Sequence, residues 1–480
     1  MYDLPAGFTQ RLFGKSPPLI LIGPIVAVAG CFVSFSGATK QMSYAKILAA
    51  KTLKGVAGKR FKARLLRVLG PGLITGASDD DPSGIATYSQ AGAQFGFSIT
   101  WTLLFTYPLM AAIQEISGRI GRVTGRGVAA NLRHHYPNVI LQCVVALVLI
   151  ANTINIGADL GAMGDAVHLL FGGSTVLYVG LIALLCVILE VFISYDRYVS
   201  ILKWLTLALF AYFGTVMVVK VPWAEAAQGF FIPTLSSKLE FWTMVVAIFG
   251  TTISPYLFFW QASQEVEDIN AVKERKPLVE APKQGPDALN RIRIDTYIGM
   301  AFSNLVSLAI MFTTAATLHV AGKTDIQTSS QAAEALRPVA GEFAFVIFAL
   351  GIIGTGLLAV PVLAGSAAYA LGEARKWPVG LDRKPKKAKA FYLTIAVATS
   401  VGTLIVFSPL DPMTALVWSA VINGVVAVPI MVMMMLMISS KKIMGKFVIT
   451  GPLKLVGWIS TAAMGVAALI LALTSVVSLM

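Results

Sequence analysis

The sequence predicts an all-α membrane protein of about eleven transmembrane helices, built as an inverted five-plus-five repeat. Of its 480 residues, 56% are hydrophobic and only 13% are charged, which is about half the charged fraction of a soluble domain. Eleven segments are mainly apolar over the roughly 20 residues that a helix needs to cross a bilayer. The first and the sixth of these segments are each interrupted near the middle by a proline beside small polar residues.

The apolar segments define the expected spans and a division of the chain. An additional apolar run covers residues 17–36, and it is a twelfth span, a signal-like segment or the product of a start codon upstream of Met42. We therefore separate an N-terminal segment, 1–67, from a membrane domain, 68–480. The eleven predicted spans are 68–91, 98–117, 139–163, 174–194, 199–221, 242–266, 294–321, 342–371, 389–409, 413–437 and 453–476.

The basic residues indicate the orientation in the membrane. If the eleven spans alternate, 32 of the 38 Lys and Arg residues fall on one side, and such an excess marks the cytoplasmic side. The stretch 40–67 is then cytoplasmic, the C-terminus lies outside, and the protein is a multi-pass protein of the cell membrane. This distribution explains the net charge of +14 without nucleic acid.

Several other functions lack support in the sequence. The three cysteines lie in apolar runs and form no CxxC or Cys/His pattern, so we expect neither disulfides nor a zinc site. The run Gly354–Ala359 matches a dinucleotide fingerprint in letters only, because it lies inside an apolar span with no strand before it. No phosphate-binding loop is visible, so we expect no enzyme, no nucleotide-driven pump and no cofactor.

The first interruption places three consecutive aspartates, Asp79 to Asp81, before Pro82, Ser83 and Gly84. A carboxylate at membrane depth is costly, and proline cannot continue the helix that shelters the backbone. Unwound backbone is tolerated there only where it is buried in protein or lines a cavity. Free carbonyls beside a carboxylate would make an oxygen-rich cation site; the alternative is a proline kink with its acids near water.

The second interruption lies in the sixth span, where Gly250, Thr251 and Ser254 precede Pro255. Broken helices separated by five spans are typical of inverted-repeat transporters of the LeuT type, which bind substrate between two discontinuous helices. The pair of interruptions therefore predicts a site between 79–84 and 250–255.

The stretch GPGLITGASDDDPSGIATYSQAGAQFG resembles the first helix of the Nramp (natural resistance-associated macrophage protein) family of divalent-metal transporters. That family carries Asp-Pro-Gly-Asn there, followed by a run like Gln90–Gly96. Its sixth helix carries Ala-x-x-Met-Pro-His, which aligns with Thr251, Ser254, Pro255 and Tyr256. The resemblance covers about 68–476 and implies a transporter whose substrate is a divalent metal ion. The expected partners are divalent metal ions and the lipid bilayer around the spans.

The sequence departs from the family pattern at positions that ligate the metal ion. Asp81 keeps the family's metal-binding aspartate, whereas the family's asparagine is Gly84, its methionine ligand is Ser254 and its alanine is Thr251. A thioether favours transition metals, whereas a wider, all-oxygen site suits a partly hydrated Mg²⁺. The sequence therefore looks like the magnesium-transporting branch, carrying Mg²⁺ and/or Mn²⁺. The metal ligands implied by the resemblance are Asp81, Ser83, Gly84, Thr251 and Ser254.

Several titratable residues of the family's proton route are also replaced in this sequence. Its sixth-helix histidine is Tyr256, one third-helix acid is kept as Asp159, and the other two acids align with Asn152 and Ala162. The ninth span has no arginine, and a relay needs groups that titrate within the membrane. We therefore expect transport into the cell uncoupled from protons. The alternatives are a relay through other residues in an ordinary proton-coupled Mn²⁺/Fe²⁺ importer, and a membrane sensor that does not transport.

Two further acidic groups flank the interruptions. Asp79 and Asp80 are additional to the family pattern; they either face an aqueous vestibule that attracts cations or are gathered with Asp81 by unwinding. The acids at the end of the sixth span form an inner acidic mouth or a solvated helix end. These acids are Glu265, Glu267 and Asp268, and Gln264 stands beside them.

Overall fold

The computed structural model describes residues 75, 76, 78–192, 207, 209–406 and 411–479. The run 17–36, the basic stretch 40–67 and parts of the predicted spans 68–91 and 199–221 lie outside the described residues. The division of the chain after residue 67 stays a prediction for the same reason.

The described part of the chain is helical, without a β-strand, which confirms the all-helical fold class. Each of the eleven predicted spans overlaps at least one helix. Among the described residues, seven helical segments are long and apolar enough to cross a membrane, or up to eight if the bent pair of α5 (Pro82–Phe95) and α6 (Trp101–Thr124) counts as one span. The main helices are α5 (Pro82–Phe95), α6 (Trp101–Thr124), α8 (Asn138–Phe171), α9 (Thr175–Phe192), α11 (Phe210–Val218), α13 (Leu239–Thr252), α14 (Pro255–Ala271), α15 (Gly285–Thr314), α18 (Ala344–Arg375), α19 (Lys389–Ile405), α20 (Pro412–Ile438) and α22 (Pro452–Leu479).

Short helices occupy several connections that the sequence left unassigned. An amphipathic pattern forms α12 (Trp223–Phe231), and Thr328 starts α16 (Ser329–Ala333) with a reciprocal capping box to Gln331. A capping box satisfies backbone donors at both the cap and the third helical position. The remaining short α-helices of the described connections are α7 (Val128–His135), α17 (Arg337–Ala340) and α21 (Lys441–Met444).

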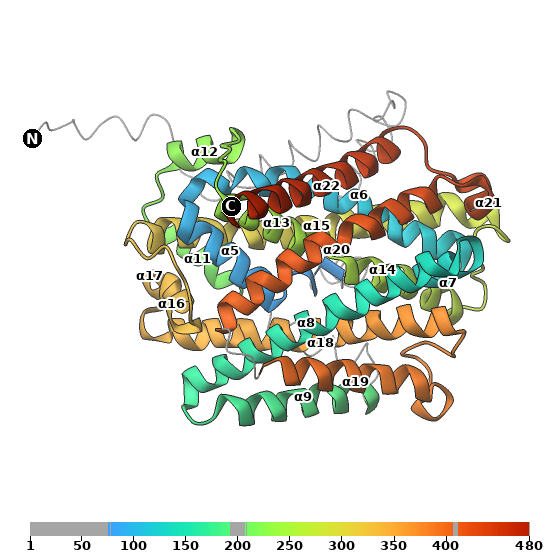
Figure 1. The fold of residues 1–480 in the computed structure, drawn as a ribbon, viewed down its shortest axis with the longest axis horizontal. Helices are drawn as coiled ribbons and strands as arrows, with labels where there is room; N and C mark the ends of the chain where they lie inside the picture. Colours follow the sequence, from blue (N-terminus) through green and yellow to red (C-terminus); the bar gives the residue numbers. More distant parts are fainter. Residues whose placement is uncertain (1–74, 77, 193–206, 208, 407–410, 480) are drawn as a thin grey trace, which may run out of the picture. The chain divides into compact units, whose positions relative to one another are not determined.

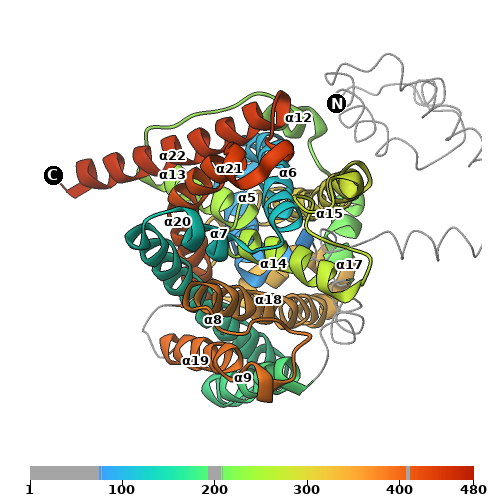
Figure 2. The same ribbon diagram turned by 90° about the vertical axis from the view of Figure 1, so that its right-hand side faces the viewer.

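The long helices pack side by side, and the same neighbours are visible in both views. Figures 1 and 2 show α9 and α19 side by side at one edge, with α8 and α18 next to them. α13 packs on α20, α14 on α6, and α15 on both α5 and α6. Gly250 makes the contact of α13 with α20 close, since a Cβ there would lie 1.9 Å from the carbonyl oxygen of Ala420. Small residues commonly allow such close approach between membrane helices.

Both sequence interruptions are breaks in helical backbone with the same local chemistry. The helical backbone before the first break reaches Asp79; Asp81 is extended (φ −71°, ψ 170°) and caps α5, which begins at Pro82. At the second break α13 ends at Thr252, Ser254 is extended (φ −78°, ψ 131°), and α14 begins at Pro255. Proline suits the first helical position because its missing N–H is not needed there. The inverted relation between the two halves stays a prediction.

Candidate metal site

Asp81 lies at the start of α5 with its carboxylate directed at the helix end. Its Oδ1 accepts hydrogen bonds from the backbone N–H of Gly84 at 2.7 Å and from the Ser83 hydroxyl at 2.8 Å. A carboxylate at a helix N-terminus is stabilised by the free N–H groups and the helix dipole. The same local geometry that breaks the helix therefore supports a buried negative charge.

The second oxygen of Asp81 connects the break to three other helices. Oδ2 accepts a hydrogen bond from Asn155 Nδ2 in α8 at 3.1 Å. Asn155 Oδ1 in turn accepts from the hydroxyl of Ser419 in α20 at 2.7 Å. The Tyr256 hydroxyl in α14 lies 3.5 Å from Oδ2 and 3.0 Å from the carbonyl oxygen of Ser78. A hydroxyl donates one proton, and the shorter contact makes Ser78 the better acceptor.

The two breaks approach each other at Gly84 and Thr251. A Cβ atom on Gly84 would lie 3.0 Å from Thr251 Oγ1. That hydroxyl is buried and has no hydrogen-bond partner among the described residues. A buried hydroxyl without a partner costs free energy, so Thr251 brings an uncommitted oxygen donor to the first break.

The Ser254 hydroxyl hydrogen-bonds to backbone carbonyl oxygens at the second break. It lies 2.7 Å from the carbonyl oxygen of Gly250 and 2.9 Å from that of Thr251. The residue after it is Pro255, which has no N–H to offer the Thr251 carbonyl. The hydroxyl takes the place of that donor, while its lone pairs and both carbonyl oxygens remain able to bind a cation.

The structure thus brings the sequence-predicted ligands to the two break ends. Ser83 and Gly84 bond to Asp81 directly, Thr251 faces Gly84, and Ser254 holds the carbonyl of Thr251. Within the part of the chain that the structure describes, no group of three or more His, Cys, Asp or Glu residues is placed to hold a metal ion. The available donor set is one carboxylate with hydroxyl and carbonyl oxygens, which fits a partly hydrated ion in passage.

Two residues that align with the family's proton-route acids, Asp159 and Asn152, lie on α8. Asp159 is buried close to Asp81 and the Ser83 backbone, and neither of its carboxylate oxygens makes a hydrogen bond of good geometry among the described residues. Asn152 instead donates from Nδ2 to the Leu363 carbonyl at 2.9 Å and joins α8 to α18. Asn152 is therefore a contact between helices at this point.

Asp79 and Asp80 do not face the expected aqueous vestibule. Only 1% of Asp79 and 2% of Asp80 is exposed, and both carboxylates contact the hydroxyl of Ser303 in α15, at 2.6 and 3.1 Å. Nor does the break gather all three aspartates, because the partners of Asp81 come from α5, α8 and α14. The unwound backbone sends two carboxylates to one side and the third to another.

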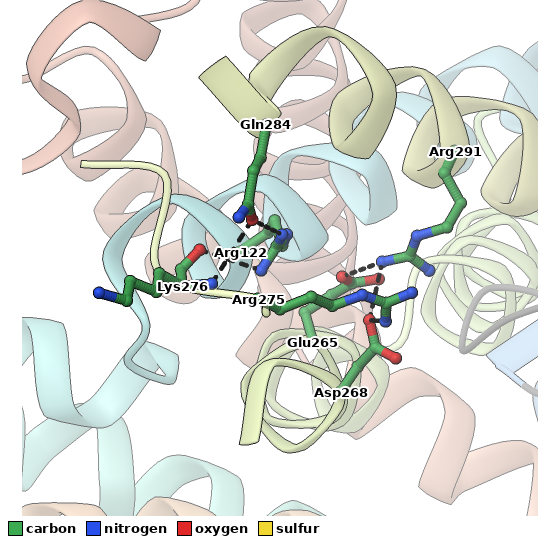
Figure 3. A network of polar contacts seen from close by, with 7 residues as sticks. All are labelled: Arg122, Glu265, Asp268, Arg275, Lys276, Gln284 and Arg291. Carbon is green, nitrogen blue, oxygen red and sulfur yellow. Dashed lines mark hydrogen bonds and ion pairs between the residues drawn. The ribbon is translucent and has the colours of Figure 1, made fainter. Parts of the chain in front are cut away.

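Of the two alternatives for the end of α14, the open acidic mouth does not form, because ion pairs and hydrogen bonds hold its acids (Figure 3). Glu265 is fully buried, and its Oε2 lies 2.5 Å from Arg291 Nη2 in α15. Asp268 lies 3.3 Å from the same guanidinium and also pairs with Arg275. Glu267 accepts hydrogen bonds from the Tyr369 hydroxyl and the Leu381 N–H. Gln264 has a buried Nε2 without a hydrogen-bond partner in the described residues.

A buried arginine extends this network to the segment between α14 and α15. Arg122, near the end of α6, donates to the Lys276 carbonyl at 3.2 Å and to Gln284 Oε1 at 3.0 Å (Figure 3). The ends of α6, α14 and α15 are therefore tied together by side chains.

Sequence reasoning missed three polar residues inside the bundle. Asn155 could have been found, because the spacing of Asn152, Asn155 and Asp159 puts them on one face of a helix. Ser303 had no distinguishing signal. Glu190 stands alone in the apolar run of α9, and both of its buried carboxylate oxygens lack hydrogen-bond partners among the described residues.

Comparisons with known proteins agree with this fold. The family described as "Natural resistance-associated macrophage protein-like" matches residues 72–474. The divalent metal cation transporter MntH of Klebsiella pneumoniae is 25% identical over 408 residues, covering 83% of this chain and 91% of that protein. MntH of Deinococcus radiodurans is also 25% identical, over 421 residues, covering 86% and 90%.

A solved structure shows the same fold. The manganese transporter of Eremococcus coleocola, in complex with an aromatic bis-isothiourea substituted compound, superposes with a TM-score of 0.68 at 16% identity, covering 88% of this chain and 93% of that one. Since the family match spans most of the sequence and the fold agrees, the chain belongs to the Nramp family, whose members are membrane transporters and not enzymes.

Proposed function

We propose that this chain carries divalent metal cations into the cell, Mg²⁺ and/or Mn²⁺, without proton coupling, through a site centred on Asp81. The relatives in Klebsiella and Deinococcus are named divalent metal cation transporters, which supports the class of ion. The single observation that carries the proposal is the meeting of the two helix breaks at Gly84 and Thr251 beside the Asp81 carboxylate.

The chemistry of the donors supports a hard ion. Ser254 offers a hydroxyl where the family has a thioether, and Thr251 adds an unbonded hydroxyl. Hard oxygen donors suit Mg²⁺ and Mn²⁺, whereas a sulfur donor favours softer metals. Mg²⁺ also keeps several waters when bound, and carbonyl and hydroxyl oxygens can hold such an ion through these waters.

The chain's own residues suggest how the ion is held and driven. Gly84 N–H and Ser83 fix Oδ1 of Asp81, so the carboxylate keeps one orientation while Oδ2 exchanges Asn155 for the ion. A negative-inside membrane potential favours entry of a divalent ion by about 4.6 kcal/mol per 100 mV. This driving force needs no proton gradient.

One observation favours a second candidate, proton-coupled Mn²⁺/Fe²⁺ import. Asp159 is a buried carboxylate beside Asp81 without a well-formed hydrogen bond among the described residues, and such a group is suited to carrying a proton. Against it, Tyr256 stands in place of the histidine and α19 contains no arginine.

Reconstituted vesicles distinguish these candidates. Uptake of Mg²⁺ and Mn²⁺ is measured at a set membrane potential, with a pH-sensitive dye inside and the Asp81→Asn variant as a charge-removing control. We expect uptake of both ions by the wild type, little by the variant, and constant internal pH. Acidification that depends on divalent uptake would favour the proton-coupled candidate, and absence of flux would leave the fold without transport.

A further inference from the structure

The acidic side chains before the first break form a group separate from Asp81. Asp79 and Asp80 both contact Ser303 in α15, whereas Asp81 contacts Asn155 in α8 and groups at the start of α5. α15 packs directly on α5. Two carboxylates therefore lie on the α15 side of the break, and one lies on the α8 side.

The charges of Asp79 and Asp80 have no protein counter-ion in the described part of the chain. None of its ion pairs includes either residue, and Asp79 Oδ1 is buried without a hydrogen-bond partner. The one proton of the Ser303 hydroxyl cannot satisfy both carboxylates at once. Adjacent buried carboxylates are unfavourable unless a proton or a cation lies between them.

A tyrosine supplies an independent observation. The Tyr88 hydroxyl in α5 is buried and makes no hydrogen bond of good geometry among the described residues. Ser307, one turn beyond Ser303 in α15, lies beside this hydroxyl. A Cβ on Gly84 would lie 3.4 Å from the Tyr88 ring and 3.5 Å from the Asp79 carbonyl oxygen, so the ring and the Asp79 backbone border the same point of the break. An uncommitted buried hydroxyl thus adds a further oxygen on the same side of the break.

We propose that Asp79 and Asp80, with the hydroxyls of Ser303 and Tyr88, form a second binding site for a hard divalent cation, distinct from the Asp81 site. Carboxylate and hydroxyl oxygens are the donors that such ions prefer. An ion bound there offsets the repulsion among the three neighbouring aspartates. The protein would then hold this ion in addition to the one at Asp81. The inference rests on the proposed function only for the class of ion.

The test counts bound ions in the purified full-length protein. Mn²⁺ is titrated into the detergent-solubilised protein, and free Mn²⁺ is followed by its electron paramagnetic resonance signal. We expect two sites in the wild type and one in the Asp79→Asn/Asp80→Asn variant. Ser303→Ala keeps two sites, one of them weakened about tenfold, because a hydrogen bond to a charged group is lost. Asp287→Asn, which removes an exposed charge from the first turn of α15, is the control and keeps both sites.

Two results would overturn the inference. One is a wild type that binds a single Mn²⁺. The other is a stoichiometry and affinity for Mn²⁺ that stay unchanged in both the Asp79→Asn/Asp80→Asn and the Ser303→Ala variants. The second result would mean that protons, and not a metal ion, neutralise Asp79 and Asp80. If the double variant does not fold, Ser303→Ala alone decides. The proposed function fails separately: Asp81→Asn would then keep both Mn²⁺ sites while the Asp79→Asn/Asp80→Asn variant loses one.

Discussion

Restoring the family's asparagine at position 84 should fail unless Thr251 is shortened at the same time. A Cβ on Gly84 would approach Thr251 Oγ1 to 3.0 Å, and the rest of the asparagine needs more room. Thr251 is buried at the end of α13, where Gly250 already contacts the α20 backbone, so the backbone cannot retreat. Thr251→Ala removes the opposing hydroxyl and restores the residue that the family carries there.

The magnitude follows from the packing. Inserting a larger side chain into a filled interior costs about 1–3 kcal/mol, so Gly84→Asn alone should lose about tenfold or more of the Mg²⁺ transport rate. Residues in direct contact show coupling of about 0.5–3 kcal/mol in a double-mutant cycle. We expect Gly84→Asn/Thr251→Ala to recover most of that loss, and the addition of Ser254→Met to shift the Mn²⁺/Mg²⁺ uptake ratio by about tenfold toward Mn²⁺.

The assay is competitive uptake of the two ions into vesicles for the wild type, the single variants and the combinations. Thr251→Ala alone is the matched control, since it removes the hydroxyl without adding volume. Additive effects of Gly84→Asn and Thr251→Ala would refute contact between the two breaks. A wild type that prefers Mn²⁺, or an unchanged ion ratio after Ser254→Met, would refute the hard-donor account of selectivity.

Three further predictions test the site, the ion pair and the orientation. Asp81→Ala should abolish divalent-ion flux while elution as a single species in detergent is kept; normal flux would remove Asp81 from the site. Arg291→Gln should lower the free energy of unfolding by about 3 kcal/mol, because it leaves Glu265 buried without a counter-ion. Lys323→Gln breaks an exposed pair and should cost at most about 1 kcal/mol; equal losses in thermal unfolding would contradict this distinction. A cysteine at the exposed position Glu280 should resist an impermeant thiol reagent outside whole cells, and should react in inverted vesicles; rapid external labelling would reverse the predicted orientation.

The sequence alone determined the positions of the helices and of their breaks. Apolar runs of about 20 residues and the excess of basic residues between them are local properties of composition. The breaks were also readable, because Pro82 and Pro255 lack the N–H that a continuing helix requires. The candidate ligands Asp81, Ser83 and Gly84 lie within one turn of the first break, so local geometry was enough to group them.

Only the tertiary structure decided which distant residues meet. It sent Asp79 and Asp80 to Ser303, and it joined Asp81 to Asn155, 74 residues away in the chain. It also buried Glu265 against Arg291 where an open acidic end was one of two alternatives. The direction of a side chain at an unwound position has no periodicity, and the partner that neutralises a buried charge is chosen by how helices pack, so neither can be read from local sequence.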